Sequence, residues 1–98
     1  AMDALRLALW QTPHPADSAE ALMRLQTVAR DAAAQGAHWL ITPEMFLTGY
    51  LIDPALIAAR AEPVDGPLIA AVRAIALREG IGLVTGWPEA NPGALPYN

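Results

Sequence analysis

Three short apolar runs, separated by two stretches with helical periodicity, restrict the fold more than any other feature. The runs lie at residues 5–10, 38–42 and 81–86. Neighbouring parallel strands need a connection of a dozen or more residues, which is usually a helix. The order strand, helix, strand, helix, strand therefore predicts two crossover units with parallel strands, and an α/β fold. We expect the first strand to be covered on both faces, because its side chains are apolar on both sides.

The helices have clear start and stop signals. Asp17 followed by Glu20 has the spacing of a capping box, and Gly36 suits a helix end, so a helix is expected from Asp17 to about Gln35. Its apolar stripe consists of Leu22, Leu25, Ala29 and Ala32. Outside that stripe, Arg24, Arg30 and Asp31 are interpreted as solvated surface charges.

Two further helices are expected. Asp53 and Pro54 predict a short helix that ends near Ala61. The segment 65–67, Asp-Gly-Pro, opens a longer helix that runs to about Glu79, with Gly80 as its stop. Residues 90–98 are expected to form a turn-rich loop.

Composition limits the classes of function. Ninety-eight residues suffice for one domain, spanning residues 1–98, yet 54% of them are hydrophobic and only 16% are charged. Such an apolar excess suggests that some surface meets another chain or a further part of the protein. The net charge of −4 and six scattered arginines disfavour nucleic acid and membrane partners. We expect a soluble, cytoplasmic protein, and the apolar excess favours a homo-oligomer. Ala1 before Met2 is interpreted as a processing remnant.

One carboxylate stands out at the end of the second strand. Glu44 lies between Pro43 and the apolar residues Met45, Phe46 and Leu47, so we expect it to be partly buried and to act as an acid or base. The carboxyl ends of parallel strands meet at one edge of the sheet, where ligands usually bind. Residues 10–11 and 87–89 should reach the same edge.

A structural interpretation of the same residues stays open. Thr42 has the character of an N-cap, Pro43 suits the first position of a helix, and Glu44 would then favour the helix dipole. Neither histidine supports a metal site: His14 is expected to be a solvated loop residue and His38 a packing or edge residue.

The segment Thr42-Pro43-Glu44-Met45-Phe46-Leu47-Thr48-Gly49-Tyr50 resembles the glutamate motif of the nitrilase superfamily, the carbon–nitrogen hydrolases. Similar features of that family are the strand ending in Trp10-Gln11, the helix start at 65–67, the segment 86–89 and the closing Tyr97-Asn98. The resemblance covers nearly the whole chain, as the N-terminal third or so of a longer enzyme. It implies an α-β-β-α sandwich, of which this chain supplies a strand-helix-strand-helix-strand part, and members that usually dimerise.

The resemblance also implies a mechanism. Family members use a glutamate, a lysine and a cysteine, and Glu44 falls on the glutamate as the general base that activates a thiol. The sequence contains no lysine and no cysteine. Tyr50 is a candidate substrate-binding residue, with a packing role left open, while Glu89 and Glu79 are weaker candidates. Glu89 is expected to brace the strand end and Glu79 to be solvated.

The leading hypothesis is a hydrolase of amides or nitriles, without metal or cofactor, whose isolated 98 residues are inactive. The alternative is a catalytically inactive α/β module for interaction or regulation. A nucleotide-binding fold is disfavoured, because no glycine-rich loop follows any strand.

Overall fold

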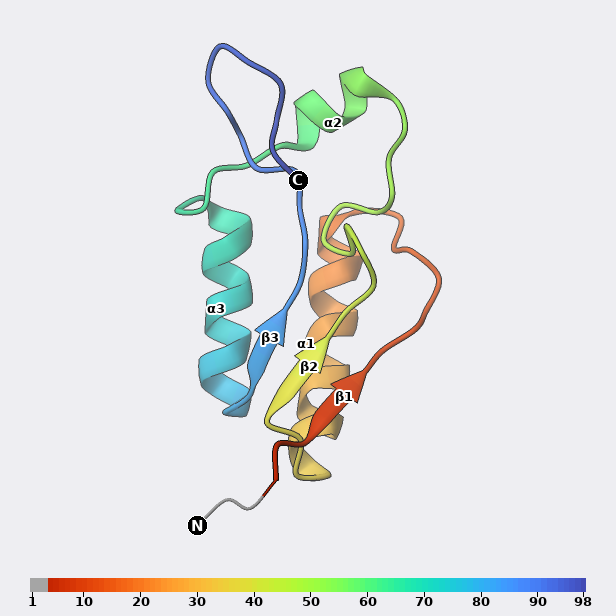
Figure 1. Ribbon diagram of the computed structural model, residues 1–98, viewed down its shortest axis with the longest axis vertical. Coiled ribbons are helices and arrows are strands. Elements are labelled where there is room, and N and C mark those ends of the chain that lie inside the picture. Colours follow the sequence, from red (N-terminus) through yellow and green to blue (C-terminus); the bar gives the residue numbers. More distant parts are fainter. Residues whose placement is uncertain (1–3) are drawn as a thin grey trace.

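The computed structural model describes residues 4–98 and contains three strands and three helices in an α/β arrangement (Figure 1). The interpretation of Ala1 and Met2 as a processing remnant lies outside the described residues. The elements are β1 (Leu7–Leu9), α1 (Ser18–Ala34), β2 (Trp39–Ile41), α2 (Pro54–Arg60), α3 (Pro67–Glu79) and β3 (Gly82–Val84).

The three strands form one parallel sheet in the order β1-β2-β3. In the middle row of the register, Ala8 lies opposite Leu40, and Leu40 lies opposite Leu83. In Figure 1, α1 lies behind the strands and α3 stands beside β3, and the two helices contact each other. All strands therefore end at the same edge, as the crossover pattern predicts.

One face of the sheet packs against the helices. Leu40 is 1% exposed at the centre of this face, and Ala8 and Leu83 pack beside it. Small residues Ala29 and Ala32 on α1 let the helix approach the strands closely. The helices contribute the remaining buried side chains of this core: Ala21, Leu25, Leu68, Ile69, Val72 and Ile75.

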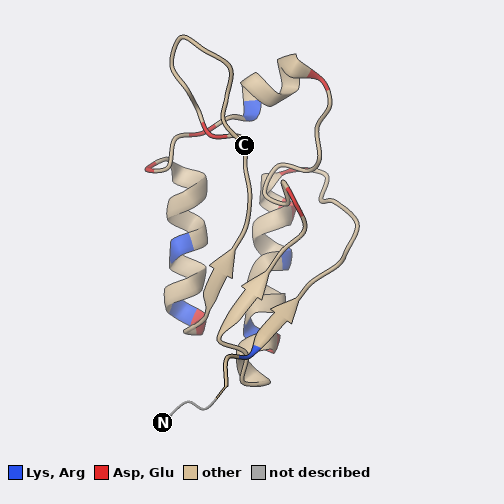
Figure 2. Cartoon of the chain, viewed as in Figure 1, with Lys and Arg blue, Asp and Glu red and all other residues tan. Residues whose placement is uncertain are grey.

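The other face of the sheet is bare. Leu7, Leu9, Trp39 and Val84 are 52%, 74%, 42% and 47% exposed. The expectation that the first strand is covered on both faces is therefore wrong for residues 4–98, because α1 and α3 both pack on the same side. The strands carry no charged residue, so this face, which is turned toward the reader in Figure 2, is apolar.

The helix ends follow the sequence signals. The Asp17 carboxylate accepts a hydrogen bond from the Glu20 amide at 2.8 Å, and the Asp53 carboxylate accepts one from the Ala55 amide at 2.9 Å. Gly36 and Gly80 adopt φ values of +85° and +64°, which glycine tolerates without steric cost. The expected helix bounds are therefore correct to within one or two residues.

Two acidic residues have structural contacts. The Glu62 carboxylate accepts a hydrogen bond from the Leu68 amide at 2.9 Å, which satisfies a free donor at the start of α3. The expectation that Glu79 is solvated is wrong, because its side chain is only 10% exposed and pairs with Arg30 of α1 at 3.5 Å. This pair links the two helices that cover the sheet.

Candidate active site

Glu44 begins a five-residue turn, residues 44–48, that follows β2 at the carboxyl edge of the sheet. No helix starts here, so the interpretation of Thr42 as a helix N-cap is wrong. The Thr42 hydroxyl instead lies 3.3 Å from the Val84 carbonyl oxygen and 3.1 Å from the Thr85 hydroxyl. It therefore ties the end of β2 to the end of β3, directly before the turn.

The backbone of the turn adopts an uncommon conformation. Met45 has a φ of +55°, in the left-handed region that residues other than glycine rarely occupy. Such a conformation costs on the order of 1–3 kcal/mol and persists only where the surroundings enforce it; it occurs most often at functional sites. The strained residue here follows the candidate base directly.

Contacts from two helices hold the turn in place. The Ser18 hydroxyl at the start of α1 donates to the Leu47 carbonyl at 2.9 Å, and Arg60 at the end of α2 donates to the Thr48 carbonyl at 3.2 Å. Residues 45–49 are all buried. The turn is therefore a packed part of the domain despite its lack of regular secondary structure.

Glu44 itself is exposed, and the expectation of a partly buried carboxylate is wrong for residues 4–98. The left-handed backbone at Met45 lets Phe46 and Leu47 enter the core while Glu44 remains on the rim. Within the described part of the chain, no side chain forms an ion pair with the carboxylate. Its oxygens are open to a molecule that approaches this edge.

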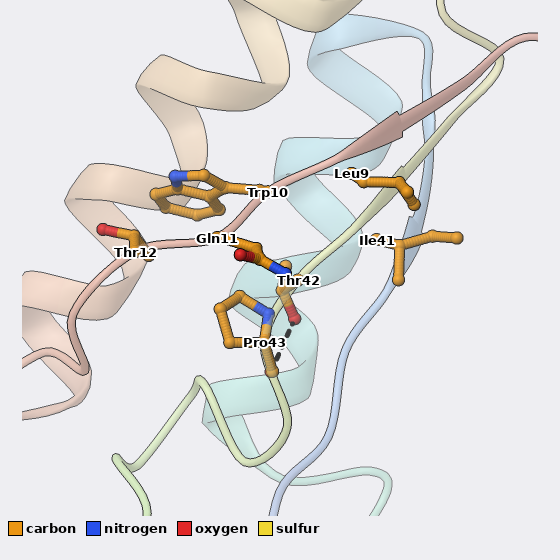
Figure 3. A pocket seen from close by; sticks show the side chains of 7 residues that line it. All are labelled: Leu9, Trp10, Gln11, Thr12, Ile41, Thr42 and Pro43. Carbon is orange, nitrogen blue, oxygen red and sulfur yellow. Dashed lines mark hydrogen bonds between the residues drawn. The ribbon is translucent and has the colours of Figure 1, made fainter.

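An open pocket of 520 Å³ lies beside the turn. Figure 3 shows its two walls, one from the end of β1 and the other from the end of β2. The lining residues are Leu9, Trp10, Gln11, Thr12, Ile41, Thr42 and Pro43. Glu44 follows Pro43 in the chain, so the structure brings residues 10–11 and the Glu44 turn to one place, as the sheet edge predicts.

The third segment predicted at this edge has a different role. The Trp87 indole nitrogen donates to the Glu62 carbonyl at 2.9 Å, and Glu89 exchanges two backbone hydrogen bonds with Tyr97 at 2.8 and 2.9 Å. Neither residue lines the pocket. Glu89 therefore braces the chain after β3, as expected for that residue.

Tyr50 lies near the turn but outside the pocket walls. Its side chain is 56% exposed, and its ring lies against His14 with a centroid separation of 5.9 Å. His14 is exposed, in agreement with the expectation of a loop residue. A role of Tyr50 in substrate binding stays a prediction.

The described residues contain no cluster of three or more side chains that could hold a metal ion. His38 uses its Nδ1 atom to accept a hydrogen bond from the Arg6 amide at 2.8 Å, which is a structural contact. None of the helices formed by residues 4–98 has both the length and the apolar character needed to cross a bilayer.

Sequence reasoning missed Arg24. The expectation that Arg24 is a solvated charge is wrong, because its guanidinium lies over the rings of Trp10 and Phe46 and donates to Thr12 and Pro13. The partners are far away in the sequence, and helical periodicity gives no signal for such contacts.

Comparison with known proteins decides the family. Residues 6–98 match the family model described as carbon-nitrogen hydrolase. The chain belongs to the carbon-nitrogen hydrolase family. The resemblance noted at the glutamate motif therefore extends over the described fold.

Relatives of this carbon-nitrogen hydrolase chain are longer than the chain itself. A protein from Pseudomonas protegens named "Hydrolase in pqqF 5'region" is 41% identical over 95 residues, which are 96% of this chain and 33% of that protein. The chain therefore spans about a third of the length of this curated relative.

Solved structures of amidases are similar to it. An amidase from Nesterenkonia sp. matches with a TM-score of 0.74 and 37% identity, covering 89% of this chain and 33% of that one. The NitN amidase from strain AN1 matches with a TM-score of 0.75 and 36% identity, over 90% and 34%. A variant of the AN1 amidase, 35% identical with a TM-score of 0.75 over 90% and 35%, is described as showing Michael addition of acrylamide at the active site cysteine.

Proposed function

We propose that this chain supplies the general base, Glu44, to a carbon–nitrogen hydrolase that acts on amides or nitriles. The observation that carries the proposal is the position of Glu44: an accessible carboxylate on a strained, firmly held turn, at the carboxyl edge of the sheet beside an open pocket. Membership of the family and similarity to amidases of known structure support the same conclusion. An amide is the favoured substrate class for that reason.

The chemistry follows from a carboxylate placed next to a thiol. Glu44 takes the proton of a cysteine thiol, and the thiolate attacks the amide carbon to form a tetrahedral oxyanion. When the carbon–nitrogen bond breaks, the nitrogen takes the proton from Glu44 and leaves as ammonia or an amine. Glu44 then removes a proton from water, which attacks the thioester and releases the acid and the thiol.

The other two groups of the triad come from outside these residues, because the sequence has no lysine and no cysteine. A lysine ammonium near the oxyanion would stabilise its charge, an effect of about 3–4 kcal/mol at comparable sites. The relatives are about three times as long as this chain, which leaves room for both groups in a complete gene product.

The bare face of the sheet fits the same proposal. In an α-β-β-α sandwich a second sheet covers this face, at a spacing of about 10 Å between sheets. Its apolar, uncharged character suits such a partner. We also propose a homo-oligomer, with exposed Met23 and Leu77 on the outer helices as contact candidates.

The test is replacement of Glu44 by Gln in the complete gene product that contains these residues. Glutamine keeps the size of the side chain and cannot take a proton, so release of ammonia from a simple aliphatic amide should fall by about 10²–10⁴-fold. Asp31→Asn on the exposed side of α1 removes one carboxylate elsewhere and should leave the rate unchanged. Amide and nitrile hydrolysis by the Glu44→Gln protein at the normal rate would remove the assignment.

One observation favours a second candidate, a catalytically inactive module for interaction or regulation. The sequence lacks the residues that would act as nucleophile and oxyanion stabiliser. The two candidates differ in the complete reading frame: the hydrolase requires a lysine and then a cysteine, each at a strand end, after Asn98.

A further inference from the structure

Arg24 lies in the first half of α1 and contacts one wall of the candidate active site and Phe46 of the Glu44 turn. We propose that Arg24 is a positioning residue, which fixes the Glu44 turn relative to the loop that forms the opposite wall of the pocket. This inference rests on the proposed function, because it assigns Arg24 to the working geometry of the same base.

The first set of contacts holds the loop after β1. The Arg24 guanidinium donates to the Thr12 hydroxyl and, at 2.9 Å, to the Pro13 carbonyl oxygen. Its central carbon also lies 5.5 Å from the centroid of the Trp10 ring, within the range of a cation–π interaction. Trp10 and Thr12 both line the pocket (Figure 3), so these contacts fix one of its walls.

The second contact reaches the turn that carries the candidate base. The guanidinium carbon lies 5.4 Å from the centroid of the Phe46 ring. Phe46 is fully buried and packs against Trp10, with ring centroids 4.7 Å apart and planes inclined by 52°. The three side chains form one stack between α1, the loop after β1 and the turn after β2.

The link from Phe46 to Glu44 is short and stiff. Only Met45 separates them, and its left-handed backbone leaves little freedom to absorb a shift of the ring. A displacement of Phe46 therefore changes the position of Glu44 relative to the opposite wall of the pocket. A base must lie within hydrogen-bond reach of the proton it removes, so such a shift reduces the rate of the chemical step.

An arginine has the properties that this position needs. Its planar guanidinium offers five donors in a fixed fork and stacks on aromatic faces, so it can hold the loop and the rings at once. A lysine ammonium is a compact point charge on a flexible stem and cannot reproduce both contacts. Lysine should therefore restore the function of Arg24 only in part.

The experiment compares Arg24→Met and Arg24→Lys with Arg30→Met in the complete gene product. Arg30 lies on the same helix, but its side chain is 63% exposed and its partner is Glu79, so its replacement controls for loss of a charge from α1. For Arg24→Met we expect kcat for an aliphatic amide to fall by about 10–100-fold, because a misplaced catalytic group has effects of that size. KM should change by less than about threefold, as for an interaction that matters mainly in the transition state.

The measurement separates positioning from folding. Thermal unfolding followed by circular dichroism gives the folded fraction, and kcat is compared at a temperature where every variant is folded. A lower kcat in Arg24→Met, a partial recovery in Arg24→Lys and a normal kcat in Arg30→Met support the proposal. A normal kcat in folded Arg24→Met overturns it.

A second variant keeps the test decisive if Arg24→Met does not fold. Thr12→Val removes one acceptor of the guanidinium and keeps the shape of the side chain, and it should lower kcat by about threefold, since one of several contacts is lost. An unchanged kcat in Thr12→Val would then count against the proposal. Retained hydrolysis in Glu44→Gln would refute the proposed function itself, whereas a normal kcat in the Arg24 variants refutes only the positioning role.

Discussion

The two faces of the sheet differ sharply although both are apolar. On the helix side Leu40 is 1% exposed and sits among the buried side chains of α1 and α3, whereas on the opposite side Leu9 is 74% exposed. The same strands supply both faces, since successive side chains of a strand point in opposite directions. An apolar residue in a strand is therefore suited to burial, but it is buried only if a helix or another sheet packs on its side of the strand.

The strongest test of this difference is Leu40→Ala on the helix side. Removing a fully buried leucine costs the transfer of its atoms and leaves a cavity, so we expect the free energy of unfolding to fall by about 2–5 kcal/mol. Chemical denaturation of the 98-residue chain measures it. A loss below about 1 kcal/mol would mean that this face is not packed as described.

The next largest loss of stability is expected for a substitution of Gly82, on the bare face of the sheet. A Cβ at Gly82 would lie 2.3 Å from the Trp39 ring, so Gly82→Ala must displace the indole. We expect a loss of about 1–3 kcal/mol in the free energy of unfolding and a shift of tryptophan fluorescence, as for overpacking elsewhere. Unchanged fluorescence would show that the ring does not lie over Gly82.

The surface pair between the two helices should contribute less. Arg30→Ala removes the contact to Glu79 at 3.5 Å from an arginine that is largely exposed to solvent. Water around the exposed arginine weakens the interaction, so the pair should be worth about 0.2–1 kcal/mol and denaturation midpoints should move only slightly. A loss of several kcal/mol would place this pair among the main contacts that hold α1 to α3.

The smallest effect in the 98-residue chain is expected for Leu9→Ala on the bare face. An exposed side chain loses few contacts, and the change should stay within about 0.5 kcal/mol. In the complete gene product, a second sheet on this face would raise the cost toward the range of about 2–5 kcal/mol of a buried leucine. Equal, small effects in both proteins would contradict the proposed covering of the face.

Much of the fold could be predicted because its signals are local. Capping by Asp17 and Asp53, and glycine at positions 36 and 80, set the helix ends within one or two residues. The crossover pattern also placed Glu44 at the carboxyl edge of a parallel sheet. These features depend on neighbouring residues, whose spacing is visible in the sequence.

The features that could not be predicted depend on distant partners or on backbone geometry. An apolar strand such as β1 indicates what could be buried, but it does not reveal which side the helices choose. The exposure of Glu44 follows from the left-handed Met45, and the stack around Arg24 joins residues from three segments. The apolar neighbours of Glu44 in the sequence therefore predict burial, whereas the side chain is exposed. The predicted position of Glu44 after the second strand is correct.

The most direct measurement of the central claim compares two polypeptides, the 98-residue chain and the complete gene product, in the release of ammonia from a simple aliphatic amide. If this chain supplies a base that needs a thiol from elsewhere, the complete protein hydrolyses the amide and the 98-residue chain shows no rate above that of buffer. Turnover by the 98 residues alone, which contain no cysteine, would contradict the account.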